Sequence, residues 1–155
     1  MASNQLHPSD KEILNVLQVD ASLTCKEISF KTRKSVATVN ERIRRLKEQG
    51  VIKAIVAVLD RKEIGKNVIA ICQVVLNDHT NNTLEQFTGA VTKLPEVMEC
   101  FQMTGNCDYL LKIAVRDVED YSNFYNTYLA KLPNITTVQT SFVLTEIKSI
   151  TAFPL

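Results

Sequence analysis

The chain has 155 residues, of which 45% are apolar and 23% charged, and its formal net charge is only +1. A chain of this length forms one compact domain, or a small module of about 50 to 60 residues joined to a larger one. The small net charge excludes a protein that is basic over its whole surface. The charge is unevenly distributed, however: residues 1–60 carry ten Lys and Arg against seven Asp and Glu, a net of +3, whereas residues 61–155 carry eight against ten, a net of −2. The positive charge therefore belongs to the first part of the chain.

Neither secretion nor membrane insertion is expected. Residues 1–8 are polar, and no apolar run approaches the 18 or so residues that a membrane span needs. Four cysteines lie in separate segments without a CxxC pair: Cys25, Cys72, Cys100 and Cys107. This pattern is typical of reduced, unpaired cysteines in a cytoplasmic protein, not of a structural zinc site. His7 and His79 lie in polar segments and are expected to be ordinary surface residues, so we predict no metal and no cofactor.

The first helix is expected to start at Ser9. Ser9 with Glu12 has the spacing of a capping box, and Ile13, Leu14 and Leu17 would then form the face that packs on the core.

Two further helices are expected before residue 51. Thr24 with Glu27 repeats the capping-box spacing and opens a short helix through Ile28. Ser35 is the expected cap of a third helix, which Gly50 ends. One apolar stripe of that helix consists of Val36, Val39, Ile43 and Leu46.

Residues 51–59 (VIKAIVAVL) are apolar and rich in β-branched side chains, which predicts a strand leaving this module. Residues 60–67, with Gly65, are the expected linker. We therefore predict a first domain over residues 1–60, consisting of a helix-turn-helix with its linking strand, and a second domain over residues 61–155.

The third helix is strongly basic. Between Lys31 and Lys53 there are eight Lys and Arg against two Glu, a local net of +6. A helix-turn-helix that presents cations to a polyanion is the obvious interpretation, and double-stranded DNA the obvious polyanion. An ordinary solvated helix face is the alternative, but it fits poorly because cations of one sign are crowded together.

With the apolar stripe inward, the helical geometry turns a second set of residues outward: Ala37, Thr38, Glu41, Arg44, Arg45 and Glu48. Arg44 can reach guanine N7 and O6, Thr38 a base or a phosphate, and Ala37 a thymine methyl. Glu41 is expected to be the salt-bridge partner of a neighbour. Arg42 lies on the flank, where bracing the fold through a carboxylate and holding a phosphate are equally plausible. The predicted DNA-binding set is Arg33, Lys34, Ser35, Ala37, Thr38, Glu41, Arg42, Arg44 and Arg45.

The second half contains an internal repeat. The segments Lys93–Val97 and Lys131–Ile135 both begin KLP and are 38 residues apart. Each ends a stretch of helical periodicity, and each is preceded and followed by a strand-like run. The expected strands are Val68–Leu76, Val97–Thr104, Tyr109–Val115 and Ile135–Thr145. The order βαββαβ predicts an α+β fold of the ferredoxin-like kind, a four-stranded antiparallel sheet with two helices on one face.

Two motifs resemble a known family. SVATVNERIRRLKEQGVI, residues 35–52, is similar to the recognition helix of the Lrp/AsnC transcriptional regulators, and GNCDYLLKIAV, residues 105–115, resembles that family's hairpin. The similarity runs from Leu6 to Ile147. It implies a winged or simple helix-turn-helix, a C-terminal effector-binding and oligomerisation domain, and regulation by amino acids. It also implies homodimers that assemble into larger rings, with an octamer as the expected size.

The chain departs from the family pattern at two places. Arg33 and Lys34 stand at the tight turn where the family often has Gly followed by Leu, and a positive φ at Arg33 would cost up to about 1 kcal/mol relative to Gly. Asn106 stands where the family's hairpin often has Asp, which removes one negative charge.

The hairpin that begins at Gly105 is the predicted effector site. An ordinary hairpin loop is the simpler interpretation, since Gly and Asn are common turn residues. The resemblance implies instead that it meets a bound amino acid, whose ammonium needs an acceptor such as Asp108 or Asn106 and whose carboxylate needs N–H or hydroxyl donors. The predicted set is Thr104, Gly105, Asn106, Cys107, Asp108, Tyr109, Thr140 and Ser141. No base or oxyanion hole accompanies Cys107, so catalysis is not expected.

Together these features predict a sequence-specific DNA-binding transcriptional regulator that senses an amino acid. An architectural DNA-binding protein of the same fold without a ligand is the main alternative. A small ferredoxin-like enzyme is a third, but it would need a cluster of titratable residues that the sequence does not show.

Overall fold

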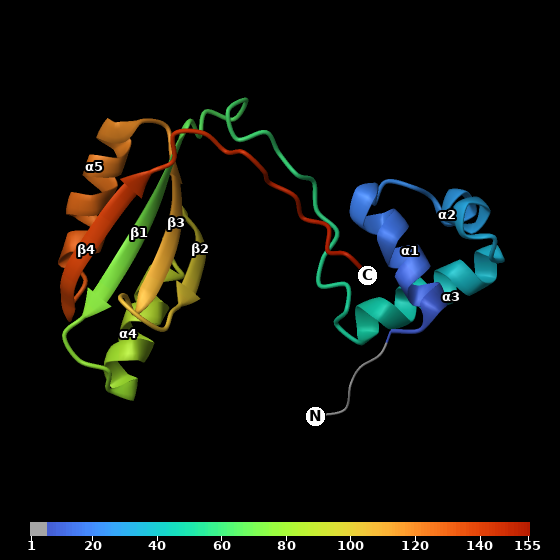
Figure 1. The fold of residues 1–155 in the computed structure, drawn as a ribbon, viewed down its shortest axis with the longest axis horizontal. Coiled ribbons are helices and arrows are strands. Elements are labelled where there is room, and N and C mark those ends of the chain that lie inside the picture. The colour runs from blue at the N-terminus through green and yellow to red at the C-terminus, as the bar shows by residue number, and fades with distance from the viewer. Residues whose placement is uncertain (1–5) are drawn as a thin grey trace. The chain divides into compact units, whose positions relative to one another are not determined.

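The computed structural model describes residues 6–155, so the predicted start of the first domain at residue 1 lies outside the described residues. Contacts divide the chain into two units (Figure 1). One contains the residues up to Val58 together with Lys148–Leu155, and the other is Leu59–Ile147. The contacts thus group the last eight residues with the first unit, although the sequence analysis placed them in the second domain. Within the first unit, the Phe153 backbone exchanges two hydrogen bonds with the Gln18 side chain of the first helix.

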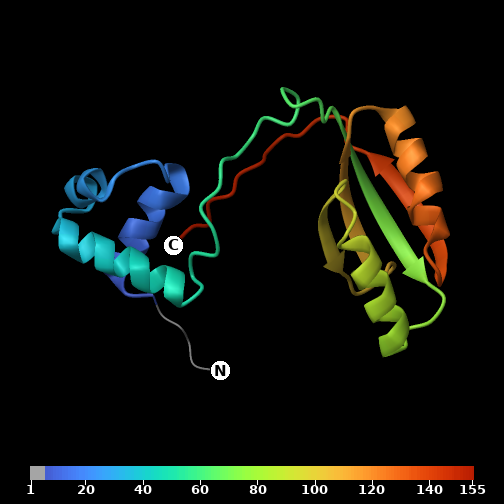
Figure 2. The same ribbon diagram turned by 180° about the vertical axis from the view of Figure 1, so that it is seen from behind.

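The first unit contains three helices, α1 (Pro8–Val19), α2 (Cys25–Thr32) and α3 (Val36–Glu48). Figure 2 shows α3 as the long helix that follows the short α2. Ile13, Ile28 and Val39, one from each helix, meet in the core and are at most 1% exposed. This small core fixes the three helices relative to one another.

Two of the predicted helix caps are confirmed and one is wrong. The Thr24 hydroxyl accepts from the Glu27 N–H, and a Glu27 carboxylate oxygen accepts from the Thr24 N–H at 2.7 Å, a complete capping box. Ser35 accepts from the Thr38 N–H at 3.1 Å. The first helix, however, is capped by His7, whose Nδ1 accepts from the Ser9 N–H at 3.1 Å. Pro8 favours the first helical position, and the cap therefore lies two residues earlier than predicted, at His7 instead of Ser9.

The apolar stripe of α3 is confirmed for most of its length. Val39 and Leu46 are fully buried, and Ile43 packs partly against the core. Val36 is 46% exposed, because it is the first residue of the helix and lies beyond the edge of the packed surface.

The strand predicted over residues 51–59 is wrong. These residues carry no sheet pairing, and Val56, Val58 and Leu59 are all more than 60% exposed. A β-branched run favours extended backbone, but a strand also needs a neighbour to accept its hydrogen bonds, and no described segment supplies one.

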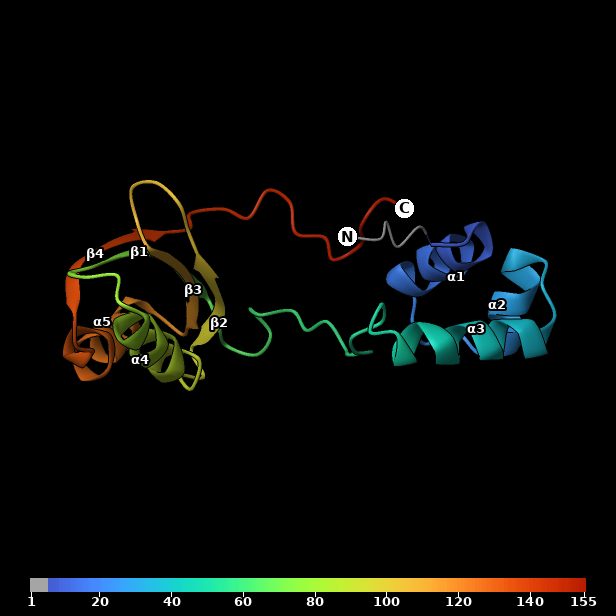
Figure 3. The same cartoon turned by 90° about the horizontal axis from the view of Figure 1, so that it is seen from below.

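The second unit has the predicted ferredoxin-like topology. Its antiparallel sheet has the strand order β2-β3-β1-β4, and Figure 3 shows both helices on the same face. The elements are β1 (Val68–Leu76), α4 (Asn81–Val91), β2 (Val97–Gln102), β3 (Tyr109–Val115), α5 (Val118–Thr127), a short 3-10 helix η1 (Leu129–Lys131) and β4 (Ile135–Phe142). Strand β2 ends two residues and β4 three residues earlier than predicted, because the chain there leaves the edge of β3 or β1.

Alternate residues of β1 and β3 form the core of this unit with the two helices. Cys72, Val74 and Leu111 are fully buried, and the ring of Phe87 on α4 lies 4.5 Å from that of Tyr109. Among the described residues, no helix combines the length and the apolar composition needed to cross a lipid bilayer.

Candidate DNA-binding surface and effector site

One exposed face of α3 gathers most of the predicted DNA-binding residues. Ala37, Thr38, Glu41 and Arg45 are exposed and, together with the half-buried Arg42, line a surface depression along the helix. Helical periodicity turns Ala37, Glu41 and Arg45 away from the buried Val39 and Leu46 and leaves Arg42 on the flank. The arrangement provides a small, polar and cationic surface at the start of a helix, which is the part of a recognition helix that meets base edges.

Arg42 and Arg45 are both tied to a carboxylate of α1. The Arg42 Nη1 lies 2.7 Å from Asp10 Oδ1, and the Arg45 Nη2 lies 3.0 Å from Asp10 Oδ2. The Asp10 side chain is 5% exposed, against 22% for Arg42 and 45% for Arg45. The brace considered for Arg42 is therefore present, and Arg45 shares it. Such a pair holds α3 on α1 and orients both guanidinium groups along the depression.

Asp10 was not among the residues predicted from the sequence. The only signal for it was a carboxylate in the first turn of α1, next to the predicted core position Ile13 and far along the chain from the arginines. Its role depends on the crossing of α1 and α3, which the sequence pattern does not give.

Arg44 is held by its own helix. Its guanidinium donates to Glu41 at 3.0 and 2.7 Å and to Glu48 at 2.5 Å, while its side chain remains 58% exposed. The expectation that Glu41 is a salt-bridge partner is confirmed, and the Arg44 hydrogen bond lowers the pKa of Glu41. Exposed pairs of this kind contribute little to stability, so they position Arg44 and can be exchanged for another anion.

The turn between α2 and α3 uses its three predicted residues in different ways. Arg33 is exposed and adopts the left-handed conformation, with φ 53° and ψ 40°, at the C-cap of α2. The Lys34 ammonium pairs with Glu12 and also donates to the Thr32 carbonyl at 3.2 Å. Ser35 caps α3. Arg33 is thus the member of this turn whose charge projects without an ion pair among the described residues.

In the second unit, Asp108 joins the β2–β3 hairpin to the end of β1. Its Oδ2 accepts from the Leu76 N–H at 2.7 Å, and its Oδ1 lies 2.7 Å from His79 Nε2. The Leu76 hydrogen bond, helped by His79, holds the pKa of Asp108 below its usual value. His79 is exposed as predicted, but it is not an isolated surface residue, because it contacts the predicted effector site.

The other hairpin residues divide between surface and core. Thr104, Gly105 and Asn106 are exposed, and Gly105 has a φ of 109°, which favours glycine at this position. Cys107 is half-buried. Tyr109 is 1% exposed in the core, and burial raises the pKa of its phenol. The prediction that Tyr109 contacts the effector is therefore corrected. Within this chain its ring packs in the core and supports the hairpin from the helix-covered side of the sheet.

Thr140 and Ser141 are not brought to the hairpin. Val74 pairs with Tyr109 on one side and Val138 on the other, so both hydroxyls lie farther along β4. The Thr140 Oγ1 lies 2.5 Å from the Tyr121 hydroxyl beneath the sheet, and Ser141 points to the opposite face. One chain alone does not gather the predicted effector-binding set.

Comparisons with known proteins agree with this architecture. Residues 6–53 match the family model described as winged helix-turn-helix DNA-binding, and residues 69–153 match the Lrp/AsnC ligand binding domain. The chain is 35% identical to the transcriptional regulator AzlB of Bacillus subtilis, over 97% of this chain and 96% of that protein. It is 34% identical to the leucine-responsive regulatory protein of Salmonella typhimurium, over 90% of this chain and 85% of the relative.

A solved structure with a bound amino acid is also similar. The transcriptional regulator NMB0573 of Neisseria meningitidis, solved as an L-Met complex, superposes with a TM-score of 0.92 at 32% identity and covers 97% of each chain. Domain order, fold and sequence identity agree over nearly the full length. The chain belongs to the Lrp/AsnC family of DNA-binding transcriptional regulators.

Proposed function

We propose that this regulator grips its operator with the exposed face of α3 and that an amino acid bound at the β2–β3 hairpin controls it. The observation that carries the DNA contact is the pair of exposed cations on α3, Arg44 and Arg45, both oriented by carboxylates, with Arg42 braced beside them on the flank of the helix. Phosphates compete well for such partly exposed guanidinium groups. Arg33 at the preceding turn adds a further phosphate contact.

The amino-acid effector is supported by the L-Met complex of the similar regulator and by the chemistry of the hairpin. The Asp108 carboxylate accepts from the Leu76 N–H and lies against the exposed His79, and its remaining lone pairs offer an acceptor to an ammonium, while the exposed loop N–H groups offer donors for a carboxylate. Thr140 is bonded to Tyr121 on the helix-covered face, whereas Ser141 points to the other face, so a second chain is needed to bring a hydroxyl such as that of Ser141 to the site.

Self-association is supported by the sheet face that the helices leave uncovered. Phe101 pairs with Leu110 on that face and is 48% exposed, and Met103 beyond it is 40% exposed. Large apolar side chains of this kind are enriched at protein interfaces. We infer homodimers that assemble into a ring, with an octamer as the expected size, acting on DNA in the cytoplasm as regulators, not enzymes.

Control then follows from linkage. An amino acid that binds one arrangement of the assembly more tightly than another shifts the population toward it, and with it the spacing of operator half-sites that the assembly can grip.

Thermal-shift screening with the twenty amino acids, followed by light scattering and operator binding with each amino acid that raises the melting temperature, tests this function. The expected result is one or a few amino acids that raise the melting temperature and change assembly size or DNA affinity. If none changes any of the three, the ligand-independent architectural protein is the correct description.

A further inference from the structure

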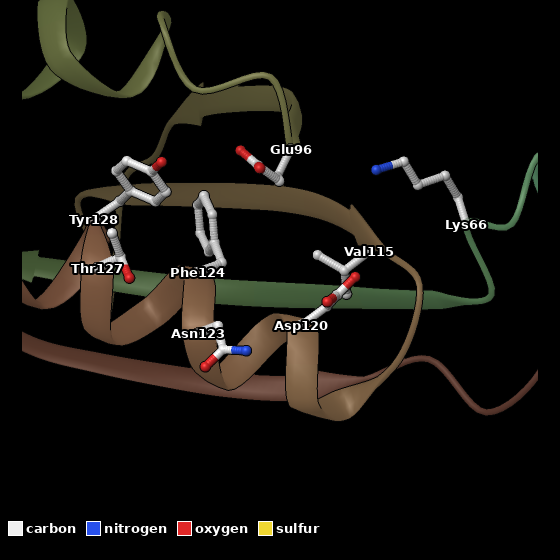
Figure 4. Close-up of a pocket in the computed structure, with 8 residues that line it drawn as sticks. All are labelled: Lys66, Glu96, Val115, Asp120, Asn123, Phe124, Thr127 and Tyr128. Carbon is white, nitrogen blue, oxygen red and sulfur yellow. The ribbon is translucent and has the colours of Figure 1, made fainter.

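A polar pocket lies in the second unit, away from the β2–β3 hairpin. It has a volume of about 300 Å³, within the lower range of small-molecule sites, and lies beside α5 and the end of β3 (Figure 4). Eight residues line it: Lys66, Glu96, Val115, Asp120, Asn123, Phe124, Thr127 and Tyr128. None of these eight residues belongs to the proposed DNA-binding surface or to the proposed effector site at the hairpin.

The floor of the pocket is apolar and rigid. Phe124 and Val115 are 4% and 2% exposed, and the ring of Tyr128 lies 5.7 Å from that of Phe124. Glu96 is fixed at the rim because its carbonyl accepts from the Ala114 N–H at 2.9 Å, beside β3. The cavity therefore belongs to the packed fold and does not depend on a loose loop.

Glu96 carries an unsatisfied acceptor. Its Oε2 is buried, and it is the one buried side-chain polar atom of residues 6–155 that has no hydrogen-bond partner. Buried polar atoms are nearly always paired, and leaving a carboxylate oxygen unpaired is costly. The unpaired Glu96 Oε2 is therefore suited to accept a hydrogen bond from a bound ligand.

The opposite charge comes from Lys66. Asp120 does not need this cation, because Arg116 donates to its two carboxylate oxygens at 2.5 Å. The pKa of Asp120 is lowered first by that Arg116 bond and only to a smaller extent by the charge of Lys66. Among the described residues no ion pair joins Lys66 to Glu96. Figure 4 shows the Lys66 ammonium extending toward the wall that carries Glu96, whose carboxylate turns toward Tyr128.

We propose that this pocket binds a small zwitterion with the chemistry of a free amino acid, separately from the hairpin. Glu96 accepts from the ligand ammonium, and Lys66 binds the ligand carboxylate. The amide of Asn123 and the hydroxyl of Thr127 lie on the exposed wall and supply further hydrogen bonds, while Phe124 supports the apolar part of the ligand. A ligand of one charge only would leave either Glu96 or Lys66 without a partner.

The test is calorimetric titration of the full chain with each of the twenty amino acids. It compares the wild type with Glu96→Gln, Lys66→Ala and Asp108→Ala. Glu85→Gln is the matched control, since it makes the same chemical change at an exposed position of α4. We expect at least one amino acid whose affinity falls about tenfold or more in Glu96→Gln and Lys66→Ala but persists in Asp108→Ala and Glu85→Gln. For that amino acid, the N-acetyl derivative and the carboxamide should both bind more weakly.

Four results would each overturn the proposal. The first is unchanged affinity for every amino acid in Glu96→Gln, and the second is an N-acetyl derivative that binds as tightly as its parent. The third concerns folding: without ligand, Glu96→Gln should melt at the same temperature as the wild type or higher, because it replaces a half-buried carboxylate, whose Oε2 has no partner, with a neutral amide. A lower melting temperature would show that Glu96 already has a structural partner. Loss of all binding in Asp108→Ala alone would place the amino acid at the hairpin and not in this pocket.

Discussion

At the residue scale, the charged side chains of α3 were predicted by type and by face but not by partner. Helical periodicity alone identifies Arg44 and Glu41 as outward, and the structure agrees. It does not identify Asp10, which binds Arg42 and Arg45 across the helix crossing. An ion pair between residues more than 30 positions apart depends on tertiary packing, so no spacing rule along one helix can reveal it.

Arg44→Ala should weaken operator binding without unfolding the protein. Its guanidinium is exposed and its partners are surface carboxylates of the same helix, so the melting temperature should hardly change. A contact to a base should cost about 5- to 150-fold in affinity and relax the preference at one operator position. Fluorescence anisotropy with operator variants measures both effects.

Lys47→Ala is the matched control for this prediction, because Lys47 is an exposed cation of the same helix outside the predicted contact face. Equal losses in both variants would indicate general electrostatic attraction. No loss in Arg44→Ala would remove this side chain from the interface.

Asp108 should make the stability of the effector domain depend on pH. Its pKa is lowered in the folded state, chiefly by the Leu76 N–H and then by His79, so the folded protein favours the carboxylate. The stabilisation is fully present above the unfolded pKa of about 4 and is lost as the pH falls through the lower folded value. Thermal melts of the wild type and Asp108→Asn from pH 7 to pH 3 should therefore differ most at neutral pH and converge in acid. A difference that stays constant across this range would contradict the assignment.

At the element scale, the second unit was predicted most completely. The two KLP segments mark the ends of two helical stretches, and the strands that flank them follow from β-branched runs, so the βαββαβ order was visible without tertiary information. The failure was the run over residues 51–59. Its composition is that of a strand, yet pairing is a property of two segments, and composition describes only one.

The turn between α2 and α3 carries a measurable strain. Arg33 occupies the left-handed C-cap position, where glycine is favoured because it has no Cβ. Arg33→Gly should raise the free energy of unfolding by up to about 1 kcal/mol, which denaturant titration can detect.

The same variant removes a cation near the predicted DNA surface, so operator affinity should fall while stability rises. Arg33→Ala separates the two effects: it should lose affinity to the same extent and gain little stability. If Arg33→Gly is less stable than the wild type, the turn does not carry the strain that its φ indicates.

At the scale of the whole molecule, the division into units follows contacts rather than sequence order. The fragment of residues 59–147 should fold and self-associate without the helix-turn-helix, since its sheet, helices and core are all contained in it. Far-UV circular dichroism and sedimentation velocity of this fragment test both parts. An unfolded fragment would mean that the second unit needs the first, and a folded monomer would place the self-association surface elsewhere.

The last residues of the chain return to α1. The Gln18 side chain accepts from the Phe153 N–H at 2.7 Å and donates to the Phe153 carbonyl at 3.1 Å. The backbone therefore passes between the two units twice, once near Val58 and once near Lys148. Residues 53–58 are exposed and unpaired, which makes them accessible to a protease. A single nick there would separate the chain into two pieces on a denaturing gel, while under native conditions the contacts of the tail with α1 would favour their staying together. The expected product is thus a nicked protein in which the only covalent link between the last eight residues and the helices of the first unit has been cut, while the Gln18–Phe153 hydrogen bonds remain.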